Sequence, residues 1–472
     1  MARSAMPNES DRPNVIVFMT DDQGYGDLSC MGATDFRTPN LDNLAANGVR
    51  FTDWYSNSPV CSPSRAALLT GRYPGNAGVR AILQGHRTAS GLPNSTPTIS
   101  SLLKDRGYQT SMVGKWHLGL TDECRPHSHG FDYWFGFLAG CIDFYSHIYY
   151  WGANRPGPGI NPTHDLWENN EEVWHDSEYF TELIAEKAIE RLRAMVAEKR
   201  ASGKPFLFYA PFNAPHYPMH APEKYTSRFA HLPWDRRIMA AMISAIDDAI
   251  GAIMNELTRL GEAEDTLTFF VSDNGPSRET RNWLDGTLDP YYGGTSGGLK
   301  GHKFSLFDGG IRMPAIAHYP ARVPGGQVVS TPCASMDIVP TALHAADGTA
   351  PTADTGEFDG TSILDLLSNA TDLPERDLYW ELDGQTAIRR GNHKLVIDGV
   401  LVEEDQPQTH IHLADLSTDT SESVNLAGDM PELASELETA ALEWRSGIQE
   451  RWDRDYADLG HGIVTYADFP VG

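Results

Sequence analysis

The alternation of short apolar runs with longer amphipathic stretches is the feature that most constrains the fold of this chain. Short apolar runs predict buried strands, and apolar residues that recur every three to four positions predict helices that cover a sheet. The strands are predicted at residues 14–19, 109–113, 206–210 and 266–271, with a weaker one at 315–318, and the helices at residues 39–47, 98–106, 178–199 and 236–260. We therefore predict an α/β fold with a large, mostly parallel central sheet flanked by helices.

The pattern changes near residue 374, where short alternating runs replace the longer units. These runs lie at residues 378–382, 386–390, 394–397 and 411–416, and an amphipathic stretch follows at residues 431–448. Short alternating runs predict antiparallel strands. We predict two domains: an α/β domain at residues 1–374 that carries the chemistry, and a C-terminal α+β subdomain at residues 375–472 with a four-stranded antiparallel sheet and a closing helix.

The charge balance limits the partners that the protein can bind. The 472 residues include 37 Lys and Arg against 64 Asp and Glu, a formal net charge of -27. This excess repels nucleic acid and anionic lipid surfaces, so we expect neither as a partner. An anionic substrate would therefore need a local positive pocket, and small anions would be favoured over long polyanions. The oligomeric state cannot be predicted from the sequence.

No apolar run of the length of a secretory signal or a membrane span is apparent in the sequence. We expect a cytoplasmic location, or a periplasmic one if a leader has been removed. The five cysteines are widely spaced and contain no CxxC pair or zinc-like spacing, which does not favour a disulfide scaffold.

Polar residues follow each of the four clear strands, at the edge of the sheet where α/β proteins bind ligands. They are Asp21 and Asp22 after the first strand, Lys115 and His117 after the second, His216 after the third, and Asp273 and Asn274 after the fourth. Asp21, Asp22, Asp273 and Asn274 offer hard oxygen ligands with three negative charges, which suit Ca²⁺ or Mg²⁺. An isolated Asp-Asp or Asp-Asn-Gly is usually only a turn, but the pair at two strand ends favours a metal site.

The segment at residues 59–71 reads as a short helix with its own start and stop signals. We expect Ser62 to cap it, Pro63 to occupy its first position and Gly71 to end it. Cys61 would then lie just before a helix N-terminus, which favours anions, with Arg65 one turn further on. A small buried Cys beside a structural Arg is the simpler alternative for such a pair.

The run Cys61-Ser62-Pro63-Ser64-Arg65, followed by Ala-Ala-Leu-Leu-Thr-Gly-Arg, resembles the signature of the type I sulfatases of the alkaline phosphatase superfamily. In that family the cysteine is oxidised to Cα-formylglycine by a maturation enzyme. The resemblance extends from the Asp-Asp-Gln-Gly-Tyr-Gly-Asp run after the first strand to Asp415-Leu416 and Asn425-Leu426. It implies an alkaline-phosphatase-like fold and a sulfuric ester hydrolase.

The resemblance also implies a role for each matched position. Asp21, Asp22, Asp273 and Asn274 match the ligands of one divalent cation, with calcium preferred and Mg²⁺ or Mn²⁺ as alternatives. Cys61 matches the formylglycine, and Arg65, Lys115 and His117 match residues that hold the hydrated aldehyde and the sulfate. His216 and Lys303 match the second His and Lys of the sulfate pocket.

The chemistry of a sulfate monoester agrees with these roles, because a poor electrophile needs cations around its oxygens and an in-line nucleophile. One hydroxyl of the aldehyde hydrate would attack sulfur and form a covalent sulfoester. Asp22 or Asp273 would take the hydroxyl proton, His216 with Lys303 would protonate the leaving alcohol, and His117 would remove the second hydroxyl proton.

A small organic sulfate ester, with an aryl ester as the first choice, is the predicted substrate. The alternatives are a carbohydrate sulfate, a phosphodiester or phosphonate monoester, and a non-catalytic sulfate-binding role with Cys61 unmodified. Residues 131–151 are rich in aromatics and are candidates for an aryl-binding wall, although core packing explains most of them. His147 and His302 are further candidates for contact with the substrate, and a structural role is an equal alternative for both. The Gly-rich residues 292–300 are expected to form a mobile loop that brings Lys303 to the site.

Overall fold

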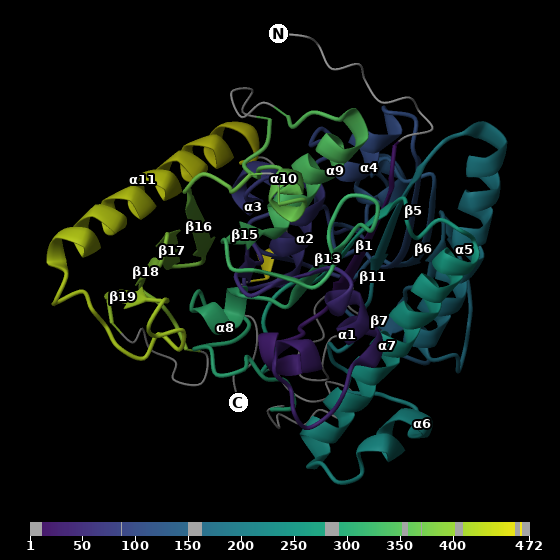
Figure 1. Ribbon diagram of the computed structural model, residues 1–472, viewed down its shortest axis with the longest axis horizontal. Coiled ribbons are helices and arrows are strands. Elements are labelled where there is room, and N and C mark those ends of the chain that lie inside the picture. Colours follow the sequence, from purple (N-terminus) through teal and green to yellow (C-terminus); the bar gives the residue numbers. More distant parts are fainter. Residues whose placement is uncertain are drawn as a thin grey trace.

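A ten-stranded mixed sheet forms the centre of the protein (Figure 1). The computed structural model describes residues 12–85, 87–149, 163–278, 292–351, 357–369, 371–401, 409–457 and 463–464. The strand order is β10-β9-β6-β5-β11-β1-β12-β13-β2-β14. These strands are β1 (Asn14–Thr20), β2 (Val49–Phe51), β5 (Gln109–Lys115), β6 (Tyr133–Phe137), β9 (Trp167–Glu168), β10 (Glu171–Glu172), β11 (Phe206–Pro211), β12 (Thr266–Ser272), β13 (Ala315–His318) and β14 (Gln327–Val329).

The pairing directions confirm the predicted α/β fold and refine it. Strands β6, β5, β11, β1 and β12 are mutually parallel, as expected for the centre of the sheet. The next strands outwards, β9 and β13, run antiparallel to their inner neighbours, so the sheet as a whole is mixed. Parallel strands buried on both faces read as continuous apolar runs, and this explains why β1, β5, β11 and β12 were visible in the sequence. The fifth parallel strand, β6, was not predicted.

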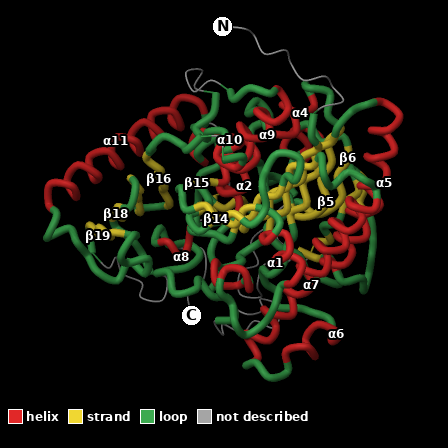
Figure 2. The backbone as a smooth tube through the Cα atoms, viewed as in Figure 1, coloured by secondary structure: helices red, strands yellow, loops and turns green. Residues whose placement is uncertain are grey.

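The central strand β1 divides the interior into two apolar cores, because successive side chains on a strand point to opposite faces. Ile16 and Phe18 pack into one core, and Val15 and Val17 into the other. Helices cover both faces of the sheet, as Figure 2 shows. The first core is covered by α1 (Pro39–Ala46), α5 (Phe180–Ser202) and α7 (Trp234–Arg259), and the second by α2 (Cys61–Thr70), α4 (Ile99–Lys104), α9 (Ile338–Asp347) and α10 (Leu364–Leu367).

Helix α7 is long and apolar enough, by length and composition, to cross a membrane. The expectation that no stretch approaches that length was therefore wrong for this helix. Its most apolar window is 78% buried inside the protein, and its side chains pack into the first core beside α5. Helix α7 is rich in apolar residues because it is buried on most of its sides.

A four-stranded antiparallel sheet with one helix follows, as predicted. It contains β16 (Asp377–Leu382), β17 (Gln385–Arg390), β18 (His393–Ile397) and β19 (Ile411–Asp415), and α11 (Pro431–Asp455) packs on it. Figure 1 places this unit at one end of the molecule, beside α8 (Asp308–Ile311). The domain boundary at residue 374 stays a prediction.

The remaining elements are short. They are β3 (Trp54–Tyr55) paired with β15 (Cys333–Ala334), β4 (Ile82–Leu83) paired with β20 (Ile463–Val464), β7 (Ile148–Tyr149) paired with β8 (Thr163–His164), and the helices α3 (Pro74–Ala77), α6 (Glu223–Thr226) and α8 (Asp308–Ile311).

Buried ion pairs join the C-terminal sheet to the α/β domain, at α8 and at the residues that follow β2. Lys394 on β18 places its Nζ 2.7 Å from Asp308 Oδ1 and 3.0 Å from Glu422 Oε1. Arg389 on β17 reaches Asp53 at 2.7 Å, and Arg312 contacts both Asp53 and Asp308, at 3.0 and 3.3 Å. We call these six residues the interface cluster.

Candidate active site

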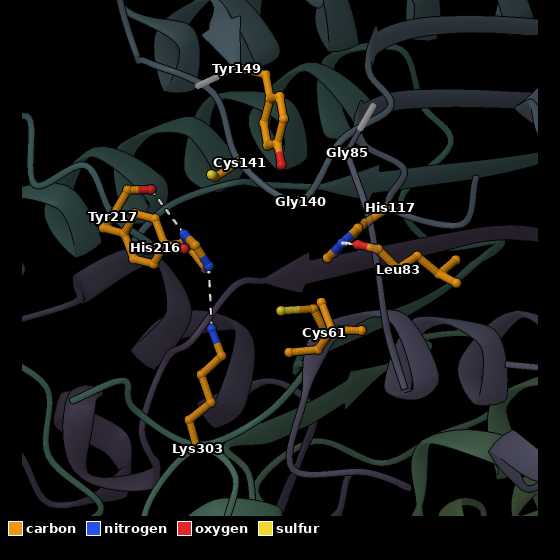
Figure 3. Close-up of a pocket in the computed structure, with 11 residues that line it drawn as sticks. Cys61, Leu83, Gly85, His117, Gly140, Cys141, Tyr149, His216, Tyr217 and Lys303 are labelled. Carbon is orange, nitrogen blue, oxygen red and sulfur yellow. Dashed lines mark hydrogen bonds between the residues drawn. The ribbon is translucent and has the colours of Figure 1, made fainter. Parts of the chain in front are cut away.

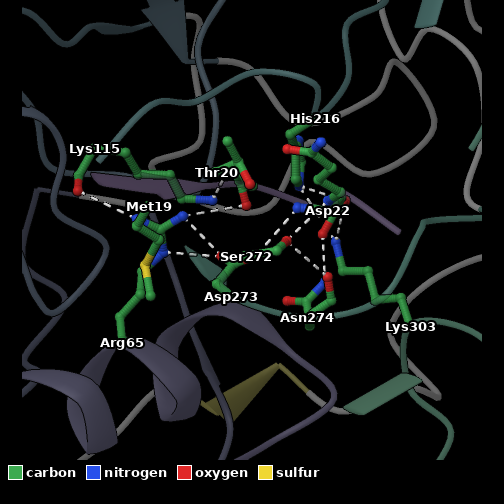
Figure 4. A network of polar contacts seen from close by, with 12 residues as sticks. Met19, Thr20, Asp22, Arg65, Lys115, His216, Ser272, Asp273, Asn274 and Lys303 are labelled. Carbon is green, nitrogen blue, oxygen red and sulfur yellow. Dashed lines mark hydrogen bonds and ion pairs between the residues drawn. The ribbon is translucent and has the colours of Figure 1, made fainter. Parts of the chain in front are cut away.

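The polar residues that follow the central strands meet at one edge of the sheet (Figure 4). Thr20 on β1 lies opposite Ser272 on β12, so Asp21 and Asp273 are the next residues on neighbouring parallel strands. The backbone N–H of Asp22 donates to Asp273 Oδ1 at 3.0 Å, and Asn274 Nδ2 donates to Asp22 Oδ1 at 2.7 Å. The structure thus brings together the four predicted metal ligands.

Two buried cations lie against these carboxylates. Arg65 donates from Nη2 and Nε to Asp273 Oδ2, at 2.7 and 3.1 Å, and lies 3.3 Å from Asp21 Oδ1. Lys115 Nζ lies 2.6 Å from Asp21 Oδ2, and both cationic side chains are fully buried. The structure therefore places Arg65 and Lys115 in contact with the predicted metal ligands.

The donor set fits a hard divalent cation. Asn274 Oδ1 is buried and has no hydrogen-bond partner among the residues that the structure describes. Burial raises the pKa of Asp22, which Lys303 opposes, and burial and the nearby Asp21 raise the pKa of Asp273. A bound cation would relieve this crowding of carboxylates and would use the amide oxygen, which is the chemistry that Ca²⁺ and Mg²⁺ prefer.

Cys61 lies beside this cluster as the first residue of α2. Ligand atoms of Asp21, Asp22, Cys61 and His216 all lie within 4.8 Å of one another. Burial raises the pKa of the Cys61 thiol well above its ordinary range, so the thiol stays protonated at neutral pH. A protonated thiol is a poor nucleophile, and the unmodified side chain is therefore unsuited to catalysis.

The start of α2 differs from the prediction. The helix begins at Cys61, and Val60 is the residue that precedes it. Ser62 was expected to cap the helix, but its Oγ accepts a hydrogen bond from the backbone N–H of Leu83 at 3.1 Å. The end was predicted correctly, because Gly71 adopts the left-handed conformation, with φ 69°.

Cys61 opens into a pocket that is also lined by His117, His216 and Lys303 (Figure 3). The rest of the wall comes from apolar, aromatic and small residues: Ile82, Leu83, Gly85, Gly140, Cys141, Tyr149 and Tyr217. The pocket thus joins a candidate nucleophile to two imidazoles and one ammonium group.

His117 is held as a neutral imidazole. Its Nε2 lies 3.1 Å from the carbonyl oxygen of Leu83, which can only accept, so Nε2 carries the proton. Burial and the nearby Lys115 and Arg65 lower the pKa of His117 well below its ordinary value. Its Nδ1 is buried without a hydrogen-bond partner among the described residues, which leaves a lone pair. A Cβ on Gly140 would lie 2.8 Å from this ring, so only glycine leaves room for the imidazole.

His216 and Lys303 form a pair on another side of the pocket. His216 Nδ1 lies 2.9 Å from the carbonyl oxygen of Tyr217, so Nδ1 carries the proton in the neutral ring. Its Nε2 lies 3.3 Å from Lys303 Nζ, which also contacts Asp22 Oδ2 at 2.9 Å. The pair can therefore hold a proton between Nζ and Nε2, facing the pocket.

Of the aromatic residues at 131–151 that were candidates for an aryl-binding wall, Tyr149 lines the pocket, whereas Trp134 and Phe135 are buried in the two cores. Other wall residues, such as Ile82 and Tyr217, were not predicted. Trp151 lies outside the described residues. Tyr217 directly follows His216, and that adjacency was the only sequence signal for it.

Neither additional histidine lines the pocket. His147 is fully buried and its ring lies 5.6 Å from that of Phe180, centroid to centroid, and His302 is buried next to Lys303. In the Gly-rich run, Thr295 donates its backbone N–H to Asp27, so this part packs against the loop after β1. Lys303 is held by its own backbone N–H, which donates to the carbonyl of Pro276 at 3.1 Å.

The mixed sheet with its parallel centre, the ligand cluster at its edge and the pocket at Cys61 define a hydrolase of the alkaline phosphatase superfamily. The chain belongs to the sulfatase family, whose model matches residues 13–349. That family uses a metal ion and a formylglycine.

Individual relatives agree with this assignment. The chain is 33% identical to human N-acetylgalactosamine-6-sulfatase over 397 residues, covering 81% of this chain and 71% of the relative. It is 31% identical to bovine arylsulfatase A over 456 residues, covering 90% and 85%. The crystal structure of Ps i-CgsB in complex with k-i-k-neocarrahexaose superposes with a TM-score of 0.79 at 29% identity, covering 95% of each chain.

Proposed function

We propose that this sulfatase hydrolyses the sulfate monoester of a sugar, with Cys61 converted to formylglycine by a maturation enzyme. One observation carries the catalytic part: Cys61 shares a pocket with His117, His216 and Lys303 and lies next to a cluster of buried oxygen ligands. A nucleophile, two proton carriers and a metal cluster in one small site suit displacement at an anionic ester.

Asp21, Asp22, Asp273 and Asn274 would hold the metal, because all four offer the oxygen donors that Ca²⁺ and Mg²⁺ prefer, and the family resemblance favours calcium. When present, the metal supplies positive charge to the sulfate oxygens, and the formylglycine hydrate supplies the nucleophilic hydroxyl. Arg65 and Lys115 hold the ligand carboxylates in place through their ion pairs at 2.7 and 2.6 Å. Asp22, which has a carboxylate oxygen within 4.8 Å of Cys61 Sγ, would accept the hydroxyl proton.

The His216–Lys303 pair would protonate the leaving alcohol. Lys303 Nζ carries the positive charge and lies 3.3 Å from the Nε2 lone pair of His216, so a proton can pass to the pocket from either atom. A sugar alkoxide is a poor leaving group, and its departure depends on such a proton.

His117 would act as the base that returns the site to its resting state. Its Nδ1 lone pair is unused, and its lowered pKa keeps the imidazole neutral at pH 7. A neutral imidazole can remove the remaining hydroxyl proton so that sulfate is expelled.

The choice of a sugar is supported by the relatives, since human N-acetylgalactosamine-6-sulfatase is 33% identical over 81% of this chain. Ps i-CgsB, at a TM-score of 0.79, was solved with a bound oligosaccharide. An aryl sulfate is the second candidate, because Tyr149, Tyr217 and Ile82 give the pocket an apolar wall and bovine arylsulfatase A is 31% identical.

Mass spectrometry and kinetics test the proposal together. The tryptic peptide of residues 51–65, from protein made in its native host, is expected to carry the aldehyde or its hydrate at Cys61. The matured enzyme is expected to release sulfate from N-acetylgalactosamine 6-sulfate with a higher kcat/KM than from 4-nitrophenyl sulfate or an aryl phosphonate monoester. Cys61→Ala, the inactive control, should lose at least roughly 10⁴-fold in activity.

Two results would contradict parts of this proposal. An unmodified thiol in native-host protein would favour a sulfate-binding role instead of catalysis. A higher kcat/KM on the aryl sulfate would replace the sugar by an aryl substrate and leave the catalytic roles standing.

A further inference from the structure

The residue that follows Lys303 has an unusual backbone conformation. Phe304 has a φ of 75°, in the left-handed region that a bulky side chain rarely adopts. Its ring is buried in the apolar core that the C-terminal sheet shares with the α/β domain. A backbone in this conformation persists only where its surroundings hold it. The contacts of Phe304 are therefore part of what fixes the position of Lys303.

Two backbone hydrogen bonds tie this turn to the segments around the site. The N–H of Phe304 donates to the carbonyl of Pro59, just before α2, at 3.0 Å. The N–H of Lys303 donates to the carbonyl of Pro276, just after Asn274, at 3.1 Å. The turn is thus anchored to the segments that carry the candidate nucleophile and a predicted metal ligand.

A third contact comes from the C-terminal sheet, which supplies none of the described residues that line the pocket. Gln385, the first residue of β17, is 5% exposed. Its Nε2 donates to the carbonyl of Phe304 at 2.8 Å, and its Oε1 accepts from the N–H of Leu306 at 3.2 Å. The same oxygen accepts from the N–H of Val400 at 3.1 Å. One side-chain amide therefore bridges the turn after Lys303 and joins it to the C-terminal sheet.

This bridge needs a donor and an acceptor on one side chain. Glutamate and methionine have nearly the length of glutamine, but an ionised glutamate cannot donate and methionine offers only a weak acceptor. Backbone groups that are buried without a partner cost free energy, so loss of the bridge favours a rearranged turn.

The position of the Lys303 ammonium group tolerates little rearrangement. Its Nζ lies 3.3 Å from His216 Nε2 and 2.9 Å from Asp22 Oδ2, so two contacts define its place. A displacement of about 1 Å in a catalytic group is enough to lower a rate on the order of 100-fold. A shift of the turn would therefore be measurable in catalysis.

We infer that Gln385 is a positioning residue for Lys303, so that the C-terminal sheet takes part in the departure of the alcohol. Gln385 holds the backbone of Phe304, and this backbone sets where the Lys303 side chain begins. The inference rests on the proposed role of the His216–Lys303 pair and adds to it the part of the chain that keeps the pair aligned.

Kinetics on two substrates test the inference. Gln385→Met removes both halves of the bridge and nearly keeps the length of the side chain. The ratio of kcat/KM on N-acetylgalactosamine 6-sulfate to that on 4-nitrophenyl sulfate should fall about tenfold or more, through kcat, because only the sugar leaving group needs the proton. This ratio does not depend on the fraction of folded or matured enzyme, since one preparation is used for both substrates.

A double variant tests whether the effect passes through Lys303. Lys303→Met alone is expected to lower the same ratio, because the ammonium group is lost. In the Lys303→Met background, Gln385→Met should lower the ratio no further, since two changes that act through one group are not additive.

Gln109→Met is the matched control. Gln109 is also buried, and its Nε2 donates to the backbone carbonyls of Met195 and Lys204, at 3.0 and 3.1 Å. It is the first residue of β5, whereas the site lies at the other end of that strand, so its ratio should equal that of the wild type. Thermal unfolding checks each variant. Gln385→Glu, which loses only the bond donated to Phe304, should give an intermediate fall in the ratio if Gln385→Met does not fold.

The outcomes separate this inference from the proposed function. An unchanged ratio for folded Gln385→Met, or a fall that adds fully to that of Lys303→Met, overturns the inference and leaves the proposed function standing. Equal losses on both substrates for Lys303→Met overturn the proposed acid, and the inference with it. A wild-type enzyme that cleaves no sugar sulfate overturns the sugar substrate alone. Phenyl sulfate, whose leaving group is poorer than 4-nitrophenolate, then replaces the sugar in the ratio.

Discussion

Two buried clusters in this protein contain the same kinds of charge and use them differently. The cluster at the active site combines three carboxylates with three cations: Asp21, Asp22 and Asp273 with Arg65, Lys115 and Lys303. The interface cluster also combines three with three: Asp53, Asp308 and Glu422 with Arg312, Arg389 and Lys394.

The difference lies in the polar atoms that remain unused. No side-chain atom of the interface cluster is buried without a hydrogen-bond partner, whereas the active site leaves Asp21 Oδ1, Asn274 Oδ1 and His117 Nδ1 without one, among the described residues. Two active-site residues, Asp22 and His117, also have positive φ values of 62° and 54°. A cluster that is satisfied internally stabilises a contact, and a cluster that is left incomplete can bind a metal and a substrate.

A pair of matched substitutions gives the largest expected contrast. Lys303→Met removes the cation that shares a proton with His216, so kcat/KM on a sugar sulfate should fall about 10³-fold, within the range for general acid catalysis. The loss should be much smaller on 4-nitrophenyl sulfate, whose leaving group needs no proton. Steady-state kinetics on both substrates measure this, and equal losses would contradict the proposed role of the pair.

The same substitution in the other cluster should act on stability. Lys394→Met leaves Asp308 and Glu422 without their shared cation, and removal of one partner of a buried ion pair costs about 3–5 kcal/mol. Denaturant unfolding measures the loss, and the double variant Lys394→Met/Glu422→Leu should recover part of it. A loss below about 1 kcal/mol for the single variant would show that the cluster does not stabilise the fold.

A smaller effect is expected in the pH dependence of stability. Burial raises the pKa of Glu422 from 4.5 to about 7, and Lys394, which opposes this, is shared with Asp308. Between pH 4.5 and 7 the folded protein keeps a proton that the unfolded chain has released. The raised pKa of Glu422 therefore adds to the free energy of unfolding in full below pH 4.5. This stabilisation, up to about 3 kcal/mol, is lost as the pH rises to 7.

Glu422→Gln tests that sign, because the amide cannot titrate. The free energy of unfolding of the wild type, minus that of the variant, should fall as the pH rises from 5 to 7. His412 is also near, but burial lowers its pKa to about 4, below this range. Parallel curves for the two proteins would show that Glu422 is ionised in the folded state throughout.

Sequence patterns predicted the parts of the fold that contain long, regular elements. The run at 14–19 corresponds to β1 (Asn14–Thr20), and the run at 206–210 to β11 (Phe206–Pro211). Strands such as β9 (Trp167–Glu168) and β10 (Glu171–Glu172) were not predicted, because two residues are too few to show a period. The antiparallel direction of β13 also depends on its partners and not on its own residues.

The site was predictable where a single rule applied. Parallel strands end at one edge, so Asp21 and Asp273 could be expected to meet, and Cys61 was visible through its motif. The contacts of Arg65 and Lys115 with carboxylates could not be predicted, since nothing local to either residue shows its partner. The same holds for the interface cluster, in which Arg389 and Asp53 are far apart in the sequence.

The burial of Cys61 has a consequence for the timing of synthesis. Its side chain is only 2% exposed in the folded protein, and the pocket that encloses it is complete only when Lys303 has been added. A ribosome adds roughly 5–20 residues per second, so the more than two hundred residues between them take on the order of 10–50 seconds. If Cys61 is oxidised as proposed, the oxidising enzyme would have that interval in which the thiol is accessible, and slower elongation in this part of the message should raise the fraction of active protein.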